Sequence, residues 1–257
     1  MIKLIASDLD GTLLQNGAME LKPEIFDTII KLKENGILFV AASGRPLSNL
    51  QHLFAPIKDD IAYIAENGTL CVYHDELISE NHFDSALASE ILADVKTQPG
   101  SEFLLASRHI SYVENSNDSY VRLIRDIMKY HIQAVDDITT VQDDFLKIAV
   151  YNQKGSETIV NYYKQKYGDR LDVVTSGNLW VDMISKDINK GYALGVLLSH
   201  LNISPADSMA FGDQYNDVEM LQLAGTSYAM SNAAPGIAYH STYVTDSVEE
   251  VLMDLIL

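Results

Sequence analysis

The chain has 257 residues, of which 47% are hydrophobic, so it can bury the core of one large domain or of two smaller ones. Asp and Glu number 36 against 18 Lys and Arg, which gives a formal net charge of −18 at pH 7. A surface this acidic repels phosphate backbones and anionic lipids, which argues against nucleic acid and against a membrane surface as partners.

Cysteine usage and the first residues predict a soluble, cytoplasmic protein. Cys71 is the single cysteine, which excludes an internal disulfide and fits a reducing compartment. The apolar start is too short for a signal peptide because Asp8 interrupts it. A long stretch without Asp, Glu, Lys or Arg, at 221–245, contains Pro235, Gly236 and several serines, so we do not expect a membrane span there.

A short apolar run at residues 4–7 predicts a buried strand that leads into two carboxylates, Asp8 and Asp10, and then Gly11. If the strand period of two continues, both acids leave the strand on the same side. Gly11 lets the chain turn, and Thr12 offers a hydroxyl and a backbone N–H. Two carboxylates this close repel each other, so we expect a cation between them or a retained proton. Mg²⁺ suits oxygen ligands of this kind.

The first third of the chain alternates strand and helix. This pattern implies right-handed crossovers and a parallel sheet covered on both faces, with ligands at the carboxyl ends of the strands. Asp8, Ser43 and the segment 66–68 (Glu-Asn-Gly) are expected at those ends. The expected elements after the first strand are a helix at 23–35, a strand at 37–42, a helix to about 54, a strand at 61–65 and a hairpin at 70–73 and 77–79.

The middle of the chain, 82–185, mixes strands and helices in a way that predicts an inserted α+β domain with an open sheet. Ten of the 18 basic residues lie in this insert, either to contact an anionic substrate or to solvate its surface. The expected elements are helices at 85–96, 119–130 and 157–167, and strands at 102–106, 110–114, 146–151, 171–175 and 179–183.

The last quarter returns to the alternating pattern. We expect a helix at 189–201, a strand at 208–211 that ends in Gly212 and Asp213, a helix through 223, and short strand–helix units around 226–230 and 242–245. The chain is therefore predicted to fold as a discontinuous α/β core, 1–81 and 186–257, interrupted by the insert.

Several side chains at the expected sheet edge have complementary chemistry. Asp8 is the candidate nucleophile, which would form an aspartyl phosphate, and Asp10 the general acid and then base. Ser43, with the backbone N–H of Gly44, is suited to hold phosphate oxygens. Lys190 begins a helix, where the dipole disfavours a cation, which indicates an anionic partner.

Three further residues follow the strand at 208–211. Asp213 is the natural third carboxylate for a metal, Asp217 lies one helical turn further and can steady the metal site indirectly, and Asn216 can donate to phosphate. Each of these candidates, taken alone, is better explained as a turn or cap residue.

Four motifs together resemble the phosphatases of the haloacid dehalogenase superfamily, in the Cof-type, sugar-phosphatase-like branch with a C2-type α+β cap. The motifs run in the family's order, and the resemblance covers the whole chain. They are Asp-Leu-Asp-Gly-Thr at 8–12, Ala-Ser-Gly-Arg at 42–45, Asn-Lys-Gly at 189–191 and Gly-Asp-Gln-Tyr-Asn-Asp at 212–217.

The resemblance implies a Rossmann-like catalytic core with an inserted cap that selects a small phosphorylated metabolite. It also implies Mg²⁺ held by Asp8, by the backbone carbonyl of Asp10 and by Asp213, with Asp8 as nucleophile and Asp10 as acid and base. Substrate binding is implied for Thr12, Ser43, Gly44, Lys190 and Asn216, whereas Arg45 either faces the substrate or ties the core to the cap.

Three other classes of protein share parts of this pattern. A receiver-like signalling domain has no cap and nothing that corresponds to Asp10. A non-catalytic metabolite-binding protein on the same fold would not need that acid either. A phosphotransferase or mutase would share the aspartyl phosphate and stays open. Sequences of the P-loop and dinucleotide types, and zinc-binding patterns of His or Cys, are absent.

Overall fold

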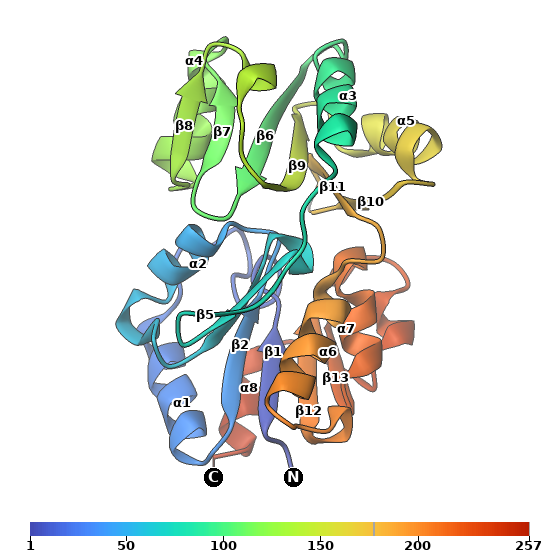
Figure 1. Ribbon diagram of the computed structural model, residues 1–257. Coiled ribbons are helices and arrows are strands. Elements are labelled where there is room, and N and C mark those ends of the chain that lie inside the picture. Colours follow the sequence, from blue (N-terminus) through green and yellow to red (C-terminus); the bar gives the residue numbers. More distant parts are fainter. Residues whose placement is uncertain (177, 257) are drawn as a thin grey trace. The chain divides into compact units, whose positions relative to one another are not determined.

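The computed structural model describes residues 1–176 and 178–256, which divide into two compact units. The first unit comprises Met1–Arg45, Leu50–Ser79 and Asn189–Leu257, and the second comprises Pro46–Asn49 and Glu80–Ile188. The chain therefore leaves the first unit and returns to it, as Figure 1 shows in the sequence colours.

The first unit is built on an eight-stranded sheet with the order β14-β13-β12-β1-β2-β3-β4-β5. In this spatial order, each neighbouring pair from β14 through β3 is parallel, and β4 pairs antiparallel with β3. The strands are β1 (Leu4–Ser7), β2 (Leu38–Ala42), β3 (Ala62–Ala65), β4 (Leu70–Tyr73), β5 (Glu76–Glu80), β12 (Ser208–Gly212), β13 (Thr226–Met230) and β14 (Tyr243–Thr245).

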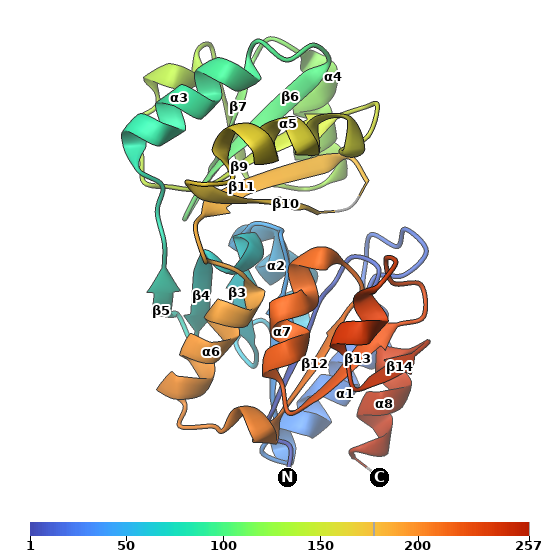
Figure 2. The ribbon, with the colours of Figure 1, turned by 90° about the vertical axis from the view of Figure 1, so that its right-hand side faces the viewer.

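Helices cover both faces of this sheet, α6 and α7 on one and α1 and α8 on the other (Figure 2). Both faces of β1 are consequently buried. Leu4 and Ala6 pack in the cluster that includes Leu194 of α6, while Ile5 alternates to the opposite face. This explains why the strand is apolar throughout. The helices of this unit are α1 (Pro23–Glu34), α6 (Lys190–His200), α7 (Val218–Leu223) and α8 (Val248–Asp254), together with the last part of α2 (Leu47–Leu53), whose first three residues belong to the second unit.

The second unit is an α+β fold on a six-stranded sheet with the order β10-β11-β9-β6-β7-β8. Its pairs are antiparallel except for β7 with β8. Helices α3 (Ser85–Val95) and α5 (Glu157–Tyr167) pack on one face and α4 (Asp118–Arg122) on the other. The strands are β6 (Ser101–Ser107), β7 (Ser111–Glu114), β8 (Ile132–Val135), β9 (Phe145–Asn152), β10 (Leu171–Thr175) and β11 (Trp180–Ser185).

The predicted α/β core with an inserted α+β segment is confirmed, but one helix was predicted wrongly. The helix expected at 119–130 ends at Arg122, and a π-helical turn follows at Leu123–Ile127, closed by a hydrogen bond of 2.9 Å from Met128 N–H to the Leu123 carbonyl. Lys129 then takes a left-handed conformation, φ 59°, which ends the helix. The strand β8 that follows was not predicted.

No helix in the described ranges, 1–176 and 178–256, combines the length and the apolar character that crossing a bilayer requires.

Candidate active site

The first unit brings the ends of β1, β2, β3 and β12 together with the start of α6, because parallel strands present their carboxyl ends at one edge of a sheet. Four of the predicted residues meet here through direct contacts or close approach: Asp8 after β1, Asp213 and Asp217 after β12, and Lys190 at the start of α6. One carboxylate oxygen from each of the three acids lies within 4.8 Å of the other two.

Lys190 links two of these acids. Its Nζ donates to Asp8 Oδ1 and to Asp217 Oδ1, each at 2.6 Å. The lysine side chain is fully buried, which is rare for this residue unless its charge is balanced. Asn189 caps α6 by accepting a hydrogen bond from Tyr192 N–H at 2.8 Å, so the helix begins at Lys190 and fixes its backbone.

Asp217 supports the loop that carries Asp213. Its second oxygen, Oδ2, accepts from the backbone N–H groups of Asp213 and Gln214, both at 2.9 Å. Both oxygens of Asp217 are therefore already engaged, one with the lysine and one with the loop. This arrangement suits a residue that organises the site rather than one that binds a metal directly.

Asp213 is held by Thr12, whose Oγ1 donates to Asp213 Oδ1 at 2.9 Å. The backbone N–H of Thr12 donates to the Leu9 carbonyl at 3.1 Å. Both groups that the sequence offered for substrate binding at Thr12 thus have partners inside the protein. Gly11, with φ +95°, lies so close to the Asp213 carboxylate that a Cβ atom at this position would collide with it.

The buried charges of the cluster do not balance by themselves. Burial lowers the pKa of Lys190, but the Asp217 and Asp8 carboxylates outweigh this effect and hold the pKa above its usual range. Burial raises the pKa of Asp8 well above its usual value, with Lys190 opposing and the neighbouring acids reinforcing. The pKa of Asp213 is raised for the same reasons, by burial and then by Asp217. One ammonium faces three carboxylates, which leaves two negative charges when all are ionised.

The donor set fits a hard divalent cation. Asp8 and Asp213 offer carboxylate oxygens, the ligands that such cations prefer, and a divalent cation would cancel the two uncompensated charges. The described residues contain this group of acids as a candidate metal site, with Asp217 as the third member.

Asp10 lies apart from this cluster and pairs with Arg45. Arg45 Nε donates to Asp10 Oδ2 at 2.8 Å and Arg45 Nη2 to Asp10 Oδ1 at 2.6 Å, a bidentate arrangement. The Asp10 side chain is 54% exposed, whereas that of Arg45 is 10% exposed. The sequence left the role of Arg45 open between substrate and cap; the structure places its guanidinium on the carboxylate of Asp10.

The phosphate-binding candidates occupy the neighbouring strand ends. Ser43 is buried directly after β2, and its Oγ accepts from Arg45 N–H at 3.2 Å. Asn216 is buried in the turn before α7, and its Nδ2 donates to Asn67 Oδ1 at 2.9 Å. Gly44 lies against the Asn67 side chain, because a Cβ atom built on Gly44 would be 2.9 Å from Asn67 Oδ1.

Sequence reasoning placed Asn67 at this edge but gave it no role. The signal was available, since Asn67 follows β3 as Ser43 follows β2, but only the fold shows which side chain it meets. The link between Thr12 and Asp213 was missed as well, because 201 positions separate the two residues.

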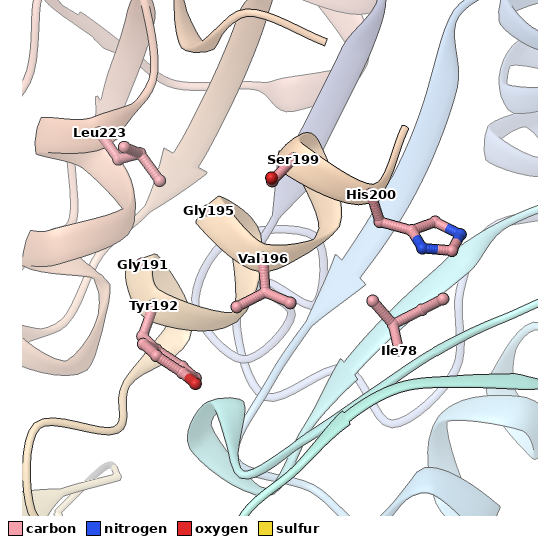
Figure 3. A pocket seen from close by; sticks show the side chains of 8 residues that line it. All are labelled: Ile78, Gly191, Tyr192, Gly195, Val196, Ser199, His200 and Leu223. Carbon is pink, nitrogen blue, oxygen red and sulfur yellow. The ribbon is translucent and has the colours of Figure 1, made fainter. Parts of the chain in front are cut away.

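A separate pocket of about 600 Å³ lies on the outer side of α6. Ile78 of β5 points toward the helix face that carries Val196 and His200 (Figure 3). The lining is mostly apolar and contains no carboxylate, so this pocket lacks the groups that make the acid cluster chemically active. Its full lining is Ile78, Gly191, Tyr192, Gly195, Val196, Ser199, His200 and Leu223.

Comparison with known proteins places this geometry in a family. The family model described as haloacid dehalogenase-like hydrolase matches residues 5–252. The 5-amino-6-(5-phospho-D-ribitylamino)uracil phosphatase YbjI of Escherichia coli (strain K12) is 28% identical over 98% of this chain and 96% of its own. The HMP-PP phosphatase of Citrobacter koseri is 27% identical over 91% of this chain and 86% of its own.

Solved structures agree in fold. A haloacid dehalogenase-like hydrolase from Bacteroides thetaiotaomicron superposes with a TM-score of 0.84 at 25% identity, covering 99% of this chain and all of that one. The match extends over both units of the chain. The chain belongs to the haloacid dehalogenase-like hydrolase family, among its Cof-type phosphatases.

Proposed function

We propose that this chain is a Mg²⁺-dependent hydrolase that releases phosphate from a small phosphorylated metabolite through an aspartyl phosphate on Asp8. The observation that carries the proposal is the buried cluster of Asp8, Lys190, Asp217 and Asp213, whose two uncompensated negative charges call for a divalent cation. The phosphatases to which the chain is similar act on phosphorylated small molecules according to their names, which supports the substrate class.

In this proposal, Asp8, the backbone carbonyl of Asp10 and Asp213 would hold Mg²⁺, which when bound offsets the charge of the carboxylates and of the phosphoryl group. Asp217 would keep the Asp213 loop in place, and Thr12 would orient the Asp213 carboxylate through its hydroxyl. Ser43, Gly44, Lys190 and Asn216 would bind phosphate oxygens.

The first chemical step would form a bond between an Asp8 oxygen and phosphorus while the ester P–O bond breaks. Lys190 donates to Asp8 Oδ1 and so limits rotation of the attacking carboxylate. Asp10 would give its proton to the departing oxygen. In the second step a water molecule would give a proton to Asp10 and attack phosphorus, which releases phosphate and restores the Asp8 carboxylate.

The ion pair between Arg45 and Asp10 has a consequence for the first step of this cycle. Its two hydrogen bonds to Asp10 suit the ionised carboxylate, which is the form that accepts a proton from water. Donation to a leaving group needs the protonated form, so we propose that the Arg45–Asp10 pair opens before the first step.

The second unit, with most of the basic residues, would act as the cap that selects the organic part of the substrate. A screen of phosphorylated metabolites for released phosphate, with Mg²⁺ and with EDTA, tests the proposal. Phosphate release that requires Mg²⁺ and vanishes in Asp8→Asn is the expected result. Transfer of the phosphoryl group to a sugar hydroxyl, seen by product analysis, would instead favour a phosphotransferase or mutase.

A further inference from the structure

The turn after β3 has a backbone that a buried segment rarely adopts. Glu66, Asn67 and Gly68 have φ angles of 51°, 59° and 100°, all in the left-handed region. Left-handed conformations are uncommon outside glycine and tend to persist where surrounding contacts over-determine them and function needs them. Glu66 and Asn67 are also almost completely buried. This turn is therefore a candidate for a role beyond joining β3 to β4.

The contacts of the turn reach each of the three neighbouring phosphate-binding segments. Asn67 N–H donates to the Ser43 carbonyl and Glu66 N–H to the Arg45 carbonyl, both at 3.1 Å. Asn67 Oδ1 accepts from Asn216 Nδ2 at 2.9 Å. The turn at 66–68 thus joins the segments after β2 and β12, although both segments are distant from it in sequence.

Gly68 contacts the third of these segments, the start of α6. A Cβ atom built on Gly68 would collide with the Asn189 carbonyl and would lie 2.9 Å from the Lys190 nitrogen. The helix start that carries Lys190 can approach the turn because position 68 has no side chain. Figure 2 shows α6 beside β3 and β4, where this contact is made.

We propose that the turn at Glu66–Gly68 is the positioning element of the phosphate site, and that Asn67 sets the orientation of the Asn216 amide. A primary amide carries two N–H donors. Asn67 Oδ1 accepts one of them, which turns the NH₂ group of Asn216 toward this side and leaves the second N–H for a phosphate oxygen. This inference rests on the proposed function, in which Asn216 binds phosphate.

The burial of Asn216 strengthens the argument. Its Oδ1 is buried and has no hydrogen-bond partner among the described residues. The hydrogen bond from Nδ2 to Asn67 is therefore the side-chain contact that fixes the rotation of this amide. Loss of the acceptor would let the amide turn its carbonyl oxygen toward a phosphate, which repels it. Asn67 therefore acts through Asn216 and is a positioning residue.

The test uses Asn67→Gly, because glycine tolerates φ 59° and the substitution removes only the side chain. Asn202→Gly is the matched control, since Asn202 has φ 54° but is exposed and lies outside the site. Binding of inorganic phosphate in the presence of Mg²⁺ is measured by calorimetry, together with the melting temperature. Losing a hydrogen bond to a charged group corresponds to a roughly ten- to hundredfold weaker Kd, which we expect for Asn67→Gly alone.

A double-mutant cycle separates positioning from general structural damage. In an Asn216→Ala background, Asn67→Gly should cause little further loss of phosphate affinity, because the residue through which it acts is gone. Equal losses in both backgrounds, or wild-type affinity in Asn67→Gly, would overturn the proposal. If the wild-type protein binds phosphate but hydrolyses no phosphomonoester, the proposed function is contradicted. The double-mutant cycle can still be interpreted in that case, because it measures phosphate binding alone.

Gly68→Ala adds a second variant at the other end of the turn. Its control is Gly36→Ala, where φ is +76° but no atom lies within 4 Å of the added Cβ. Both variants carry the backbone penalty, but only Gly68→Ala displaces the start of α6. We expect phosphate affinity to fall in Gly68→Ala and not in Gly36→Ala; equal affinities in two folded variants would count against the role of this contact.

Discussion

The substitution Lys190→Met removes the positive charge at the centre of the acid cluster and keeps a side chain of similar length. Asp8 and Asp217 then lose the donor that each contacts at 2.6 Å. Removing one partner of a buried ion pair costs ~3–5 kcal/mol of stability. The substitution also removes two charge-assisted hydrogen bonds, and at ~1.5–3 kcal/mol for each bond the summed loss is of similar size.

For a chain of this size, a loss of ~3–5 kcal/mol corresponds to a fall in melting temperature of roughly 6–20 °C, at about 2–4 °C per kcal/mol. The assay is thermal unfolding in EDTA, followed by circular dichroism. Lys3→Met is the control, because Lys3 pairs with Asp207 at 3.1 Å with its side chain 54% exposed. A solvent-exposed pair of this kind contributes little to stability, so the melting temperature of Lys3→Met should stay close to that of the wild type.

The same experiment with Mg²⁺ extends the comparison. A divalent cation offsets the carboxylates that Lys190→Met leaves uncompensated, so Mg²⁺ should raise the melting temperature of this variant more than that of Lys3→Met. If the two variants melt at the same temperature in EDTA, the charge balance that we assign to the cluster is refuted.

Three further outcomes are expected. Asp10→Asn should lose ~10²–10⁴-fold in rate on an alkyl phosphate and less on an aryl phosphate, whose leaving oxygen hardly needs a proton; equal losses on the two substrates would argue against Asp10 as the proton donor. EDTA should abolish phosphate release and added Mg²⁺ should restore it, and full turnover in chelator would rule out the metal site. Burial raises the pKa of the Cys71 thiol to about 12, so the native protein should react slowly with a thiol reagent at neutral pH and rapidly in urea, whereas immediate labelling of the folded protein would show that this thiol is accessible.

Much of the core could be predicted because its strands are buried on both faces. Continuous apolar runs such as 4–7 and 37–42 are distinctive, and the polar residues that follow them, Asp8 and Ser43, lie at the same edge of the sheet. Strand β8 could not be predicted in this way. Its four residues, Ile132–Val135, have partly buried ends and an exposed middle, a pattern without the alternation that marks a strand.

The pairings inside the site depend on the fold rather than on local sequence. Lys190 was expected to have an anionic partner, but the sequence did not show that two carboxylates of the chain itself, Asp8 and Asp217, contact it. Arg45 and Asp10 are 35 positions apart, and no spacing rule relates them. Motifs identify residue types suited to phosphoryl chemistry, whereas tertiary structure decides which of them touch.

The formation of a covalent phosphoenzyme on Asp8 is the most direct test of the mechanism. Wild-type enzyme and Asp8→Asn are mixed with a phosphomonoester and Mg²⁺, quenched in acid within a single turnover, and digested for mass spectrometry. We predict one phosphoryl group on the wild-type peptide that contains Asp8, and neither this adduct nor phosphate release in the variant. Phosphate release by Asp8→Asn at the wild-type rate, or a phosphoryl group on another residue, would contradict the account.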